Sequence, residues 1–398
     1  MTDDASIQQG LPDTDATLNL LNEAFGDWGD EARLEWRYQD FPGYDDEHTF
    51  SIRIGSELVA LRRLFEREIV SDSNRNYDCY VQGDTCVAPS YQGEGLYSKL
   101  YEETAGYCQS KGSDLDVSFN RVGNITYEAK LNRGWQYRTL PVQLRILSPE
   151  VVLPEYAQLA LDDGLITSVL ELTGRRFGLS FTDARIRLRD FVTASTDQED
   201  WALYVPIPDR LLTTLVELIT SDDPVRAVRR HLVQRRSETT RDNARTTVRE
   251  PPIDAESIDA LHELYGSVTD EYDLHFRRNR KDVEHMLAHP SLEALVTAER
   301  DDELVAAAPL CLEMDGNVLE AQVLDVAAVD NRAFAVLRDE VESVARERNA
   351  DAIVMITDYD PGSPWVCVDR QVMMWDSPED YTAPLANESL RVGLYDVT

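Results

Sequence analysis

A short glycine-rich stretch, Gln92-Gly93-Glu94-Gly95, separates an apolar, β-branched run (84–88) from an amphipathic helix pattern that follows directly. Glycines between a strand and a helix allow another group to approach the backbone closely, because they carry no side chain. Free N–H groups and the positive end of the helix dipole would point at one spot there, which makes an anion site. The stretch is too short for GxxxxGK[ST], and no GxGxxG is present, so neither the P-loop nor the dinucleotide motif applies.

The glycine stretch resembles motif A of the GNAT acyltransferase superfamily, [QR]-x-x-G-x-[GA], which follows a Val-x-Pro strand end. The matching residues are Val87, Pro89, Gln92, Gly93 and Gly95, and Tyr97 stands where the motif ends in a small residue. Downstream, "VSFNRVGNITYEAKLNRGW" (117–135) contains two asparagines and a Gly-Trp pair in the family's order. Upstream, "LEWRYQDFP" (34–42) is similar to a Trp-x-Tyr…Pro element of one GNAT branch, so the resemblance covers roughly residues 10–148.

This resemblance implies that acetyl-CoA binds where the strand at 84–88 splays from its neighbour, with pantetheine added as a strand. The residues implied in binding are Cys86, Val87, Gln92, Gly93, Glu94, Gly95, Leu96, Tyr97, Asn120 and Asn124. The implied reaction moves an acetyl or other small acyl group to a primary amine of a small molecule or peptide, with no metal. Glu94 conflicts with this, because a carboxylate repels phosphate. The pyrophosphate would then rely on backbone donors and Lys99.

The chemistry needs a base for the amine and an acid for the leaving thiolate. Asp84 is the candidate base, although a carboxylate in so acidic a chain is more often a solvated surface group. The family's usual acid is a tyrosine four residues before the Gly-aromatic pair, a position that Lys130 occupies here. Tyr127, about one turn earlier, is the candidate acid, and the alternative is a packed aromatic. Cys86 is expected to be a small core residue, since no His/Asn arrangement accompanies it.

The composition limits the possible partners and surroundings. The 398 residues carry a formal net charge of −35, and lysine is nearly absent among the 39 basic residues. Such a surface repels phosphates and argues against nucleic-acid binding, and it is typical of adaptation to concentrated salt, as in a halophilic archaeon. Five cysteines without CxxC spacing, no apolar run of 18 residues and no export signal predict a cytoplasmic protein outside the membrane, without zinc or disulfides.

The pattern of elements predicts an α/β protein made of two diverged copies of one unit, each with a mixed central sheet flanked by helices. In the first copy we expect a helix at 14–26, a hairpin at 49–70, a strand at 77–88 with a bulge at Gly83, a helix at 97–109, a strand at 115–120, a helix at 125–132 and a closing strand at 137–147. The second copy repeats the outline with a helix at 256–266, a segment at 282–290, a hairpin at 292–314, a strand at 320–329, a helix at 333–349 and a strand at 350–357.

These patterns divide the chain into a GNAT-like acyl-CoA domain (1–150), a helical or mixed connecting segment (151–250) and a degenerate GNAT-like domain (251–398). The last is expected to form its own core. It has no glycine between strand and helix in "DVAAVDNRAFAVL" (325–337), so it would support the structure or bind the acceptor in a cleft between the halves. The arginine-rich run at 225–250 is expected to pair with the protein's own carboxylates. The competing hypothesis is a non-catalytic binding or scaffold protein that kept the fold.

Overall fold

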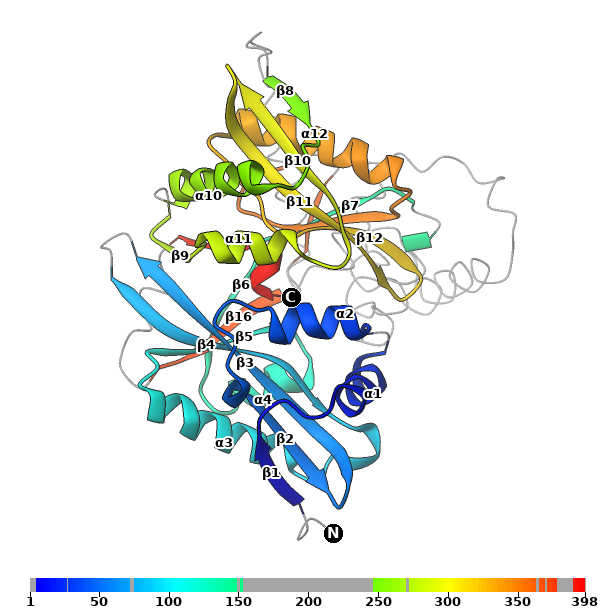
Figure 1. The fold of residues 1–398 in the computed structure, drawn as a ribbon, viewed down its shortest axis with the longest axis vertical. Coiled ribbons are helices and arrows are strands. Elements are labelled where there is room, and N and C mark those ends of the chain that lie inside the picture. The colour runs from blue at the N-terminus through cyan, green and yellow to red at the C-terminus, as the bar shows by residue number, and fades with distance from the viewer. Residues whose placement is uncertain are drawn as a thin grey trace, which may run out of the picture.

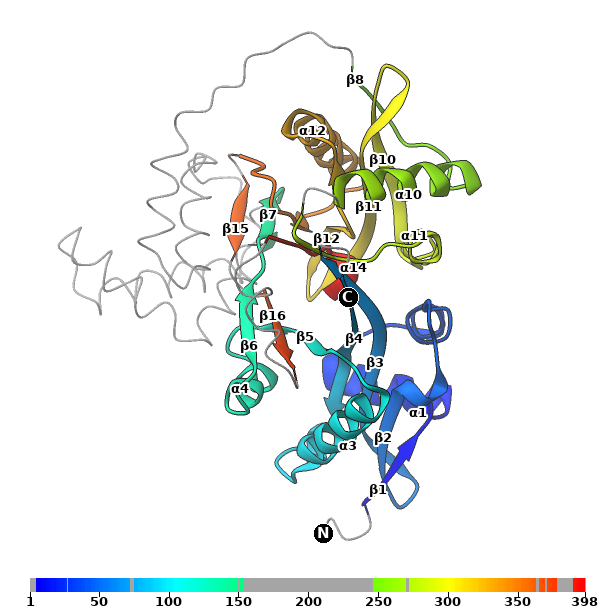
Figure 2. The same cartoon turned by 90° about the vertical axis from the view of Figure 1, so that its left-hand side faces the viewer.

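The computed structural model describes residues 5–26, 28–71, 75–148, 151–152, 246–269, 272–362, 365–368, 371–377 and 389–397. These residues form two mixed sheets with helices on both faces, which confirms the predicted α/β class with two similar copies (Figures 1 and 2). Most of the predicted connecting segment, including its arginine-rich run up to 245, lies outside the described residues. None of the described helices is long and apolar enough to cross a membrane.

The first half of the chain supplies most of one sheet. Its elements are β1 (Ala5–Gln9), α1 (Thr14–Phe25), α2 (Glu31–Leu34), a π-helical turn (Glu35–Gln39), a 3₁₀ turn (Asp46–His48), β2 (Thr49–Ile54), β3 (Glu57–Ser71), β4 (Asn76–Val87), a 3₁₀ turn (Pro89–Tyr91), α3 (Leu96–Lys111), β5 (Leu115–Arg121), α4 (Ile125–Leu131), β6 (Gln136–Thr139) and β7 (Val142–Ile146). The predicted hairpin and the helices after it are therefore confirmed. Helices α3 and α4 cover one face of the sheet and α1 the other (Figure 2).

The second half repeats this order. Its elements are β8 (Thr246–Arg249), α10 (Ala255–Thr269), β9 (Leu274–Phe276), α11 (Arg280–Leu287), β10 (Leu292–Arg300), β11 (Glu303–Asp315), β12 (Val318–Val323), β13 (Ala327–Ala328), α12 (Asn331–Glu347), β14 (Ala352–Ile356), β15 (Val366–Val368), β16 (Gln371–Asp376), β17 (Leu390–Arg391) and α14 (Leu394–Val397). The hairpin turn lies at Asp301 and Asp302, as predicted, and both residues have positive φ (55° and 65°). Aspartate tolerates this conformation better than most residues.

The two sheets exchange strands, so the prediction that 137–147 closes the first unit as one strand is wrong. The segment breaks at Leu140 and Pro141, and proline cannot donate to a strand ladder. Strand β6 stays in the first sheet, whereas β7 pairs with β14 and β15 in the second. Strand β16 returns to the first sheet and lies between β5 and β6. The resulting orders are β1-β2-β3-β4-β5-β16-β6 and β15-β7-β14-β12-β11-β10-β8.

One hydrophobic cluster spans both sheets as a result. Val81 and Val117 of the first half share it with Met373 and Trp375 of β16, and Leu144 of β7 shares it with the second sheet. The second half also contains a cluster whose buried residues all lie between 294 and 365, so the expectation of a separate core from about 255 onward stays a prediction. The predicted domain boundaries near 150 and 250 divide the chain in sequence, but each sheet contains strands from both sides of these boundaries.

Buried polar contacts join the halves as well. Trp36 donates its indole N–H to the carbonyl oxygen of His285 (2.8 Å), and its ring stacks on the imidazole (centroids 4.7 Å apart). Burial lowers the pKa of His285 to about 4, so this histidine is neutral near pH 7. Arg67 of β3 binds Asp396 of α14 at 3.0 Å, and α14 itself lies between the halves (Figures 1 and 2). His285 is thus a packing residue, and the described part of the chain has no cluster of three or more potential metal ligands.

Candidate active site

Strands β4 and β5 pair in parallel and then separate. The pairing runs from Cys79 opposite Leu115 to Gln82 opposite Ser118 and ends there. Beyond Gln82, β4 pairs only with β3. It has one more residue than β3 there, which forms a β-bulge, and Asp84 in this bulge has a positive φ of 46°. This is the bulge predicted at Gly83, one residue further on. The edge of β4 that faces the gap has no paired strand in the described part of the chain, so a ligand chain can add to it.

The glycine stretch lies at the open end of this gap. Gly93 and Gly95 have φ of 80° and 81°, a conformation that glycine adopts without strain. Gly95 caps α3 at its N-terminus, and no side chain accepts from the first N–H groups of the helix. Leu96 is buried and fixes the start of the helix, while residues 92–95 are exposed. The first N–H groups of this helix are therefore not capped by a side chain, and the anion site stays a prediction.

Glu94 does not close this site, because its side chain is exposed to solvent and a cation lies nearby. Arg133, just past the end of α4, donates to the hydroxyl of Ser98 in the first turn of α3 (3.2 Å) and lies over the ring of Tyr101. Lys99, the predicted cation, is half-buried on α3. The sequence analysis missed Arg133, whose position just before the Gly-Trp pair is its only sequence signal.

The sequence analysis also missed a second arginine, Arg62, which packs against Tyr97 in the first turn of α3. Arg62 of β3 is fully buried and donates to the hydroxyls of Thr85 (3.0 Å) and Thr104 (2.9 Å). Its guanidinium lies over the ring of Tyr97, 5.1 Å from the centroid, and forms no ion pair with a described carboxylate. This contact explains why an aromatic residue replaces the motif's last small residue. It also leaves an uncompensated positive charge below the glycine stretch.

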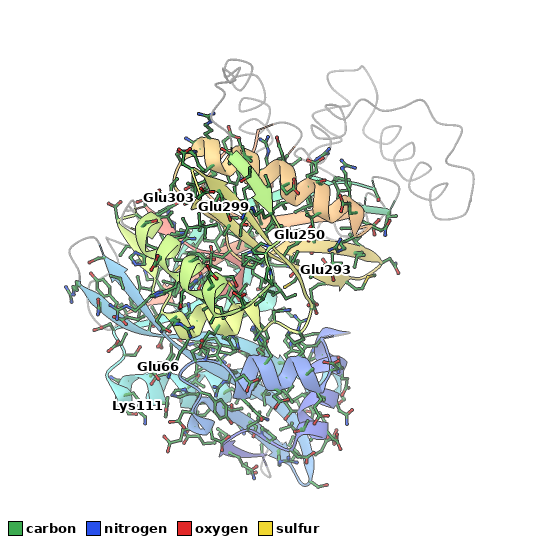
Figure 3. The ribbon with its side chains drawn as sticks, turned by 45° about the horizontal axis from the view of Figure 1, so that its top comes forward. Glu66, Lys111, Glu250, Glu293, Glu299 and Glu303 are labelled. Atoms are coloured by element: carbon green, nitrogen blue, oxygen red, sulfur yellow. The ribbon has the colours of Figure 1, made fainter. Side chains whose placement is uncertain are left out.

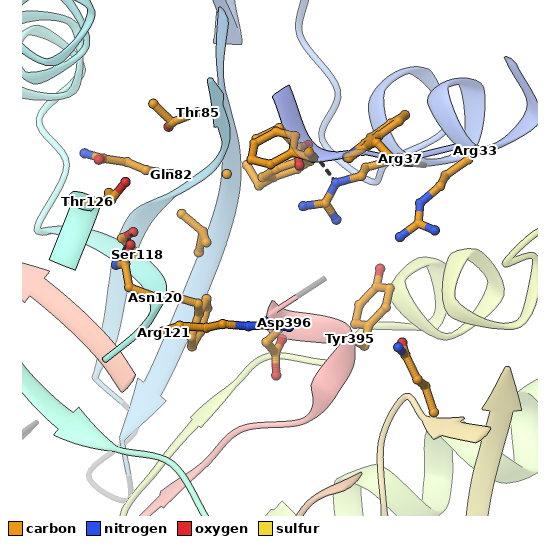
Figure 4. Close-up of a pocket in the computed structure, with 18 of the residues that line it drawn as sticks. Arg33, Arg37, Gln82, Thr85, Ser118, Asn120, Arg121, Thr126, Tyr395 and Asp396 are labelled. Carbon is orange, nitrogen blue, oxygen red and sulfur yellow. Dashed lines mark hydrogen bonds and ion pairs between the residues drawn. The ribbon is translucent and has the colours of Figure 1, made fainter. Parts of the chain in front are cut away.

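A cavity of about 460 Å³ opens on the other side of the gap, between the two halves (Figure 4). Arg33 and Arg37 reach it from α2 and the turn after it, and Gln82 and Thr85 from β4. The end of β5 and the start of α4 contribute Ser118, Asn120, Arg121, Asn124 and Thr126, the second half contributes Glu313, Met314, Asp315, Glu320 and Gln322, and α14 contributes Tyr395 and Asp396. Residues from three distant parts of the chain therefore enclose one space.

The charges around the cavity pair off, except for one. Each of its four arginines binds a carboxylate: Arg33 with Glu313 (2.6 Å), Arg37 with Asp84 (2.7 Å), Arg67 with Asp396 (3.0 Å) and Arg121 with Asp315 (3.8 Å). The fifth carboxylate, Glu320, is 6% exposed and accepts from the amide of Gln322 (3.1 Å), with no cation partner among the described residues. Burial, helped by Asp315, raises the pKa of Glu320 to about 7. Glu320 is therefore the one carboxylate of the cavity that forms no ion pair within the described residues.

The structure separates the two predicted catalytic residues. Asp84 lines the cavity, where Arg37 holds its carboxylate. Tyr127 on α4 is 7% exposed and belongs to a cluster with Trp135, and it is not among the residues that line the cavity. Asn124 caps α4 by accepting from the Tyr127 N–H (2.6 Å), which gives this asparagine a structural role.

Lys130 and Cys86 are both deeply buried. The ammonium nitrogen of Lys130 donates to the side-chain oxygen of Gln82 (2.9 Å) and lies 4.1 Å from the ring centroid of Trp135. Burial, with nearby Arg62, lowers the pKa of Lys130 well below its usual range. Burial and then Asp84 raise the pKa of the Cys86 thiol to about 12, so this residue stays a thiol, which supports the packing interpretation.

The second copy lacks the equivalent of the glycine stretch. Asp330 caps α12, and its carboxylate accepts from the N–H of Ala333 (2.7 Å). The same carboxylate pairs with Arg300 (3.0 Å). A bound carboxylate therefore occupies the place where a phosphate would bind, which agrees with the expectation from the missing glycines.

Residues 10–135 match the family model described as an acetyltransferase (GNAT) domain. Among solved structures, the chain resembles a GCN5-related N-acetyltransferase from Kribbella flavida (14% identity, TM-score 0.50), covering 94% of this chain and 71% of that one. It also resembles Saccharomyces cerevisiae N-myristoyltransferase with bound myristoyl-CoA (11%, 0.53, covering 94% and 78%). A third neighbour is a probable N-acyltransferase from Enterococcus faecalis (11%, 0.52, covering 94% and 72%). No curated protein matches the chain. At such identities the structural neighbours show a shared fold, and the family model matches less than half of the chain.

Proposed function

We propose that this chain, with a GNAT acetyltransferase domain at residues 10–135, transfers an acetyl or other small acyl group from acyl-CoA to a primary amine. The observation that carries the proposal is the separation of β4 from β5 beside a helix N-terminus that no side chain caps. Together they offer an edge for an extended chain and a seat for a phosphate.

In this proposal the pyrophosphate of CoA accepts from the backbone N–H groups of Gly93, Gly95 and the first turn of α3. Arg133 and Lys99 add positive charge. The pantetheine extends along the free edge of β4 at Cys86 and Val87, which carries the thioester toward Gln82 and Ser118. The remaining residues of the predicted set, Gln92, Glu94, Leu96, Tyr97, Asn120 and Asn124, shape this path.

The acceptor is proposed to be an amine-bearing small molecule or peptide in the cavity between the halves. Glu320 supports this, because it is the one cavity carboxylate without a cation partner in the described residues. An ammonium group would complete the pairing of charges. The second half, in which Asp330 caps the N-terminus of α12, then forms one wall of the cavity that holds the acceptor.

The reaction forms a bond from the amine nitrogen to the thioester carbon and breaks the carbon–sulfur bond. Asp84 is the proposed base that takes the amine proton, and its pairing with Arg37 fixes its carboxylate at the cavity wall. Tyr127 is the proposed acid for the CoA thiolate, and Lys130 on the same helix is the alternative. Both side chains are buried and neither lines the cavity, so burial does not distinguish the two candidates.

Titration with acetyl-CoA in molar KCl tests the CoA site. Gly95→Asp should weaken binding by roughly 100-fold, because it removes charge-assisted hydrogen bonds and places a carboxylate in the phosphate seat. The matched control is Gly112→Asp at the other end of α3, where glycine has a similar φ of 75° and where a β-carbon also meets no atom within 4 Å. Equal affinity in both variants would contradict the proposal.

The competing function is a non-catalytic GNAT-fold binding protein, which the position of Tyr127 favours. The two are separated by following the release of CoA thiol from acetyl-CoA against a panel of primary amines, from polyamines to peptides. A chain that binds acetyl-CoA and releases no CoA beyond hydrolysis with any of these amines supports the binding protein.

A further inference from the structure

Gln82 lies at the point where β4 and β5 separate. It forms the last pair of the parallel ladder with Ser118, and both residues line the cavity (Figure 4). The side chain is 5% exposed. The path proposed for pantetheine brings the thioester to this point.

The amide of Gln82 contacts Lys130. Its oxygen accepts from the Lys130 side-chain nitrogen (2.9 Å). The amide nitrogen is buried and has no hydrogen-bond partner among the described residues. A buried N–H group without a partner costs free energy, which a bound acceptor atom would recover.

Lys130 is itself held in place. It is 1% exposed, and the Trp135 ring lies against its nitrogen. A lysine this deeply buried is rare, and Gln82 is its hydrogen-bond partner in the described part of the chain. The pair therefore leaves both N–H groups of the Gln82 amide without a hydrogen-bond partner among the described residues, on a side chain that lines the cavity.

We propose that the side-chain amide of Gln82 donates a hydrogen bond to the carbonyl oxygen of the acyl thioester, and that Lys130 is the positioning residue that aims it. This rests on the proposed function. When the amine adds to the carbonyl carbon, the carbonyl oxygen gains negative charge, and the hydrogen bond from Gln82 strengthens. Because the donor is already oriented before the reaction, no rearrangement is needed at that moment.

The test compares acetyl-CoA with S-ethyl-CoA, a thioether that has no carbonyl. Wild type should bind acetyl-CoA more tightly by roughly three- to tenfold, the worth of one hydrogen bond. The ¹³C signal of carbonyl-labelled acetyl-CoA should move downfield on binding. Gln82→Glu, which keeps an acceptor for Lys130 and removes the donor, should lose both the preference and the shift.

Three further variants complete the test. Gln82→Met should behave like Gln82→Glu, and Lys130→Met should reduce the ¹³C shift because the amide is no longer aimed. Gln143→Glu, a buried glutamine of β7 outside the cavity, should change neither. Unchanged affinity for S-ethyl-CoA shows that a variant still folds. If both Gln82 variants show the same ¹³C shift as the wild-type protein, the inference about Gln82 is overturned and the proposed function is not. If the wild-type protein binds neither acetyl-CoA nor S-ethyl-CoA, both the inference and the proposed function are overturned.

Discussion

Among single residues, Glu320 couples the cavity to pH. Its pKa, about 7 in the folded protein against an ordinary 4.5, is raised mainly by burial. A raised carboxyl pKa means that folding favours the protonated form. With respect to Glu320, the protein is therefore most stable below the ordinary pKa of 4.5, where this residue is protonated in both the folded and the unfolded chain. This stability is lost as the pH rises through the folded-state pKa of about 7, because the buried carboxyl must then ionise.

Glu320→Gln should consequently stabilise the protein at alkaline pH. At about pH 8 the variant should exceed wild type by up to about 3 kcal/mol in the free energy of unfolding, and the gap should narrow toward about pH 5. Urea unfolding at constant KCl measures it. Glu303→Gln on the exposed hairpin is the matched control and should show no such trend. A gap that is constant across this range would show that Glu320 is not strained by burial.

The residues that sequence could identify are those whose signal is local. Gly93 and Gly95 were predicted because a turn between strand and helix needs their conformation. Arg62, Arg133 and Gln82 were not predicted, because β3, the end of α4 and β4 bring them to the site only through tertiary contacts. No spacing in the sequence shows that an arginine on β3 ends beneath Tyr97.

At the level of elements, the same limit applies to the strands. The two hairpins and the helices after them were predicted because their patterns and turn residues are adjacent in sequence. A strand pattern such as that of β7 or β16 carries no mark of the sheet that it joins. Pro141 ends β6 but does not indicate that the chain then crosses to the other sheet.

The exchange makes a prediction about fragments. Residues 1–152 and 246–398, expressed separately in molar KCl, should each fold poorly, because β5 lacks β16 and β14 lacks β7. Mixed, they should associate and give a cooperative unfolding transition, measured by circular dichroism and gel filtration. Fragment 246–362 lacks β15 and β16 and should fail to rescue 1–152. Separate fragments that unfold with the midpoint of the mixture would contradict the exchange.

For the whole molecule, charge is the dominant property. Acidic side chains gather on exposed strands of the second half, where Glu250, Glu293, Glu299 and Glu303 lie around β8 and β10 (Figure 3). Arg348 binds two of them, Glu250 (3.3 Å) and Glu293 (2.5 Å), but 74 acidic residues face only 39 basic ones. We therefore propose that the solvent screens most of this repulsion.

The urea midpoint should accordingly rise with KCl concentration, because the screening length falls from about 10 Å at 0.1 M to about 3 Å at 1 M. The double variant Glu66→Lys/Glu303→Lys exchanges two exposed carboxylates for ammonium groups and should need less salt for the same midpoint. A wild-type midpoint that does not depend on KCl would contradict the proposed adaptation to salt.

The position of β16 also governs how the chain is made. The ribosome synthesises β5 and β6 long before β16, the strand that lies between them. Until then the nascent chain has an unpaired edge on β5, the strand that carries Ser118. Such an edge can bind chaperones or other nascent chains until residue 376 emerges. A message truncated before β16 would therefore yield a chain that has every strand of the second sheet but lacks the strand between β5 and β6 in the first, together with Tyr395 and Asp396 of the cavity.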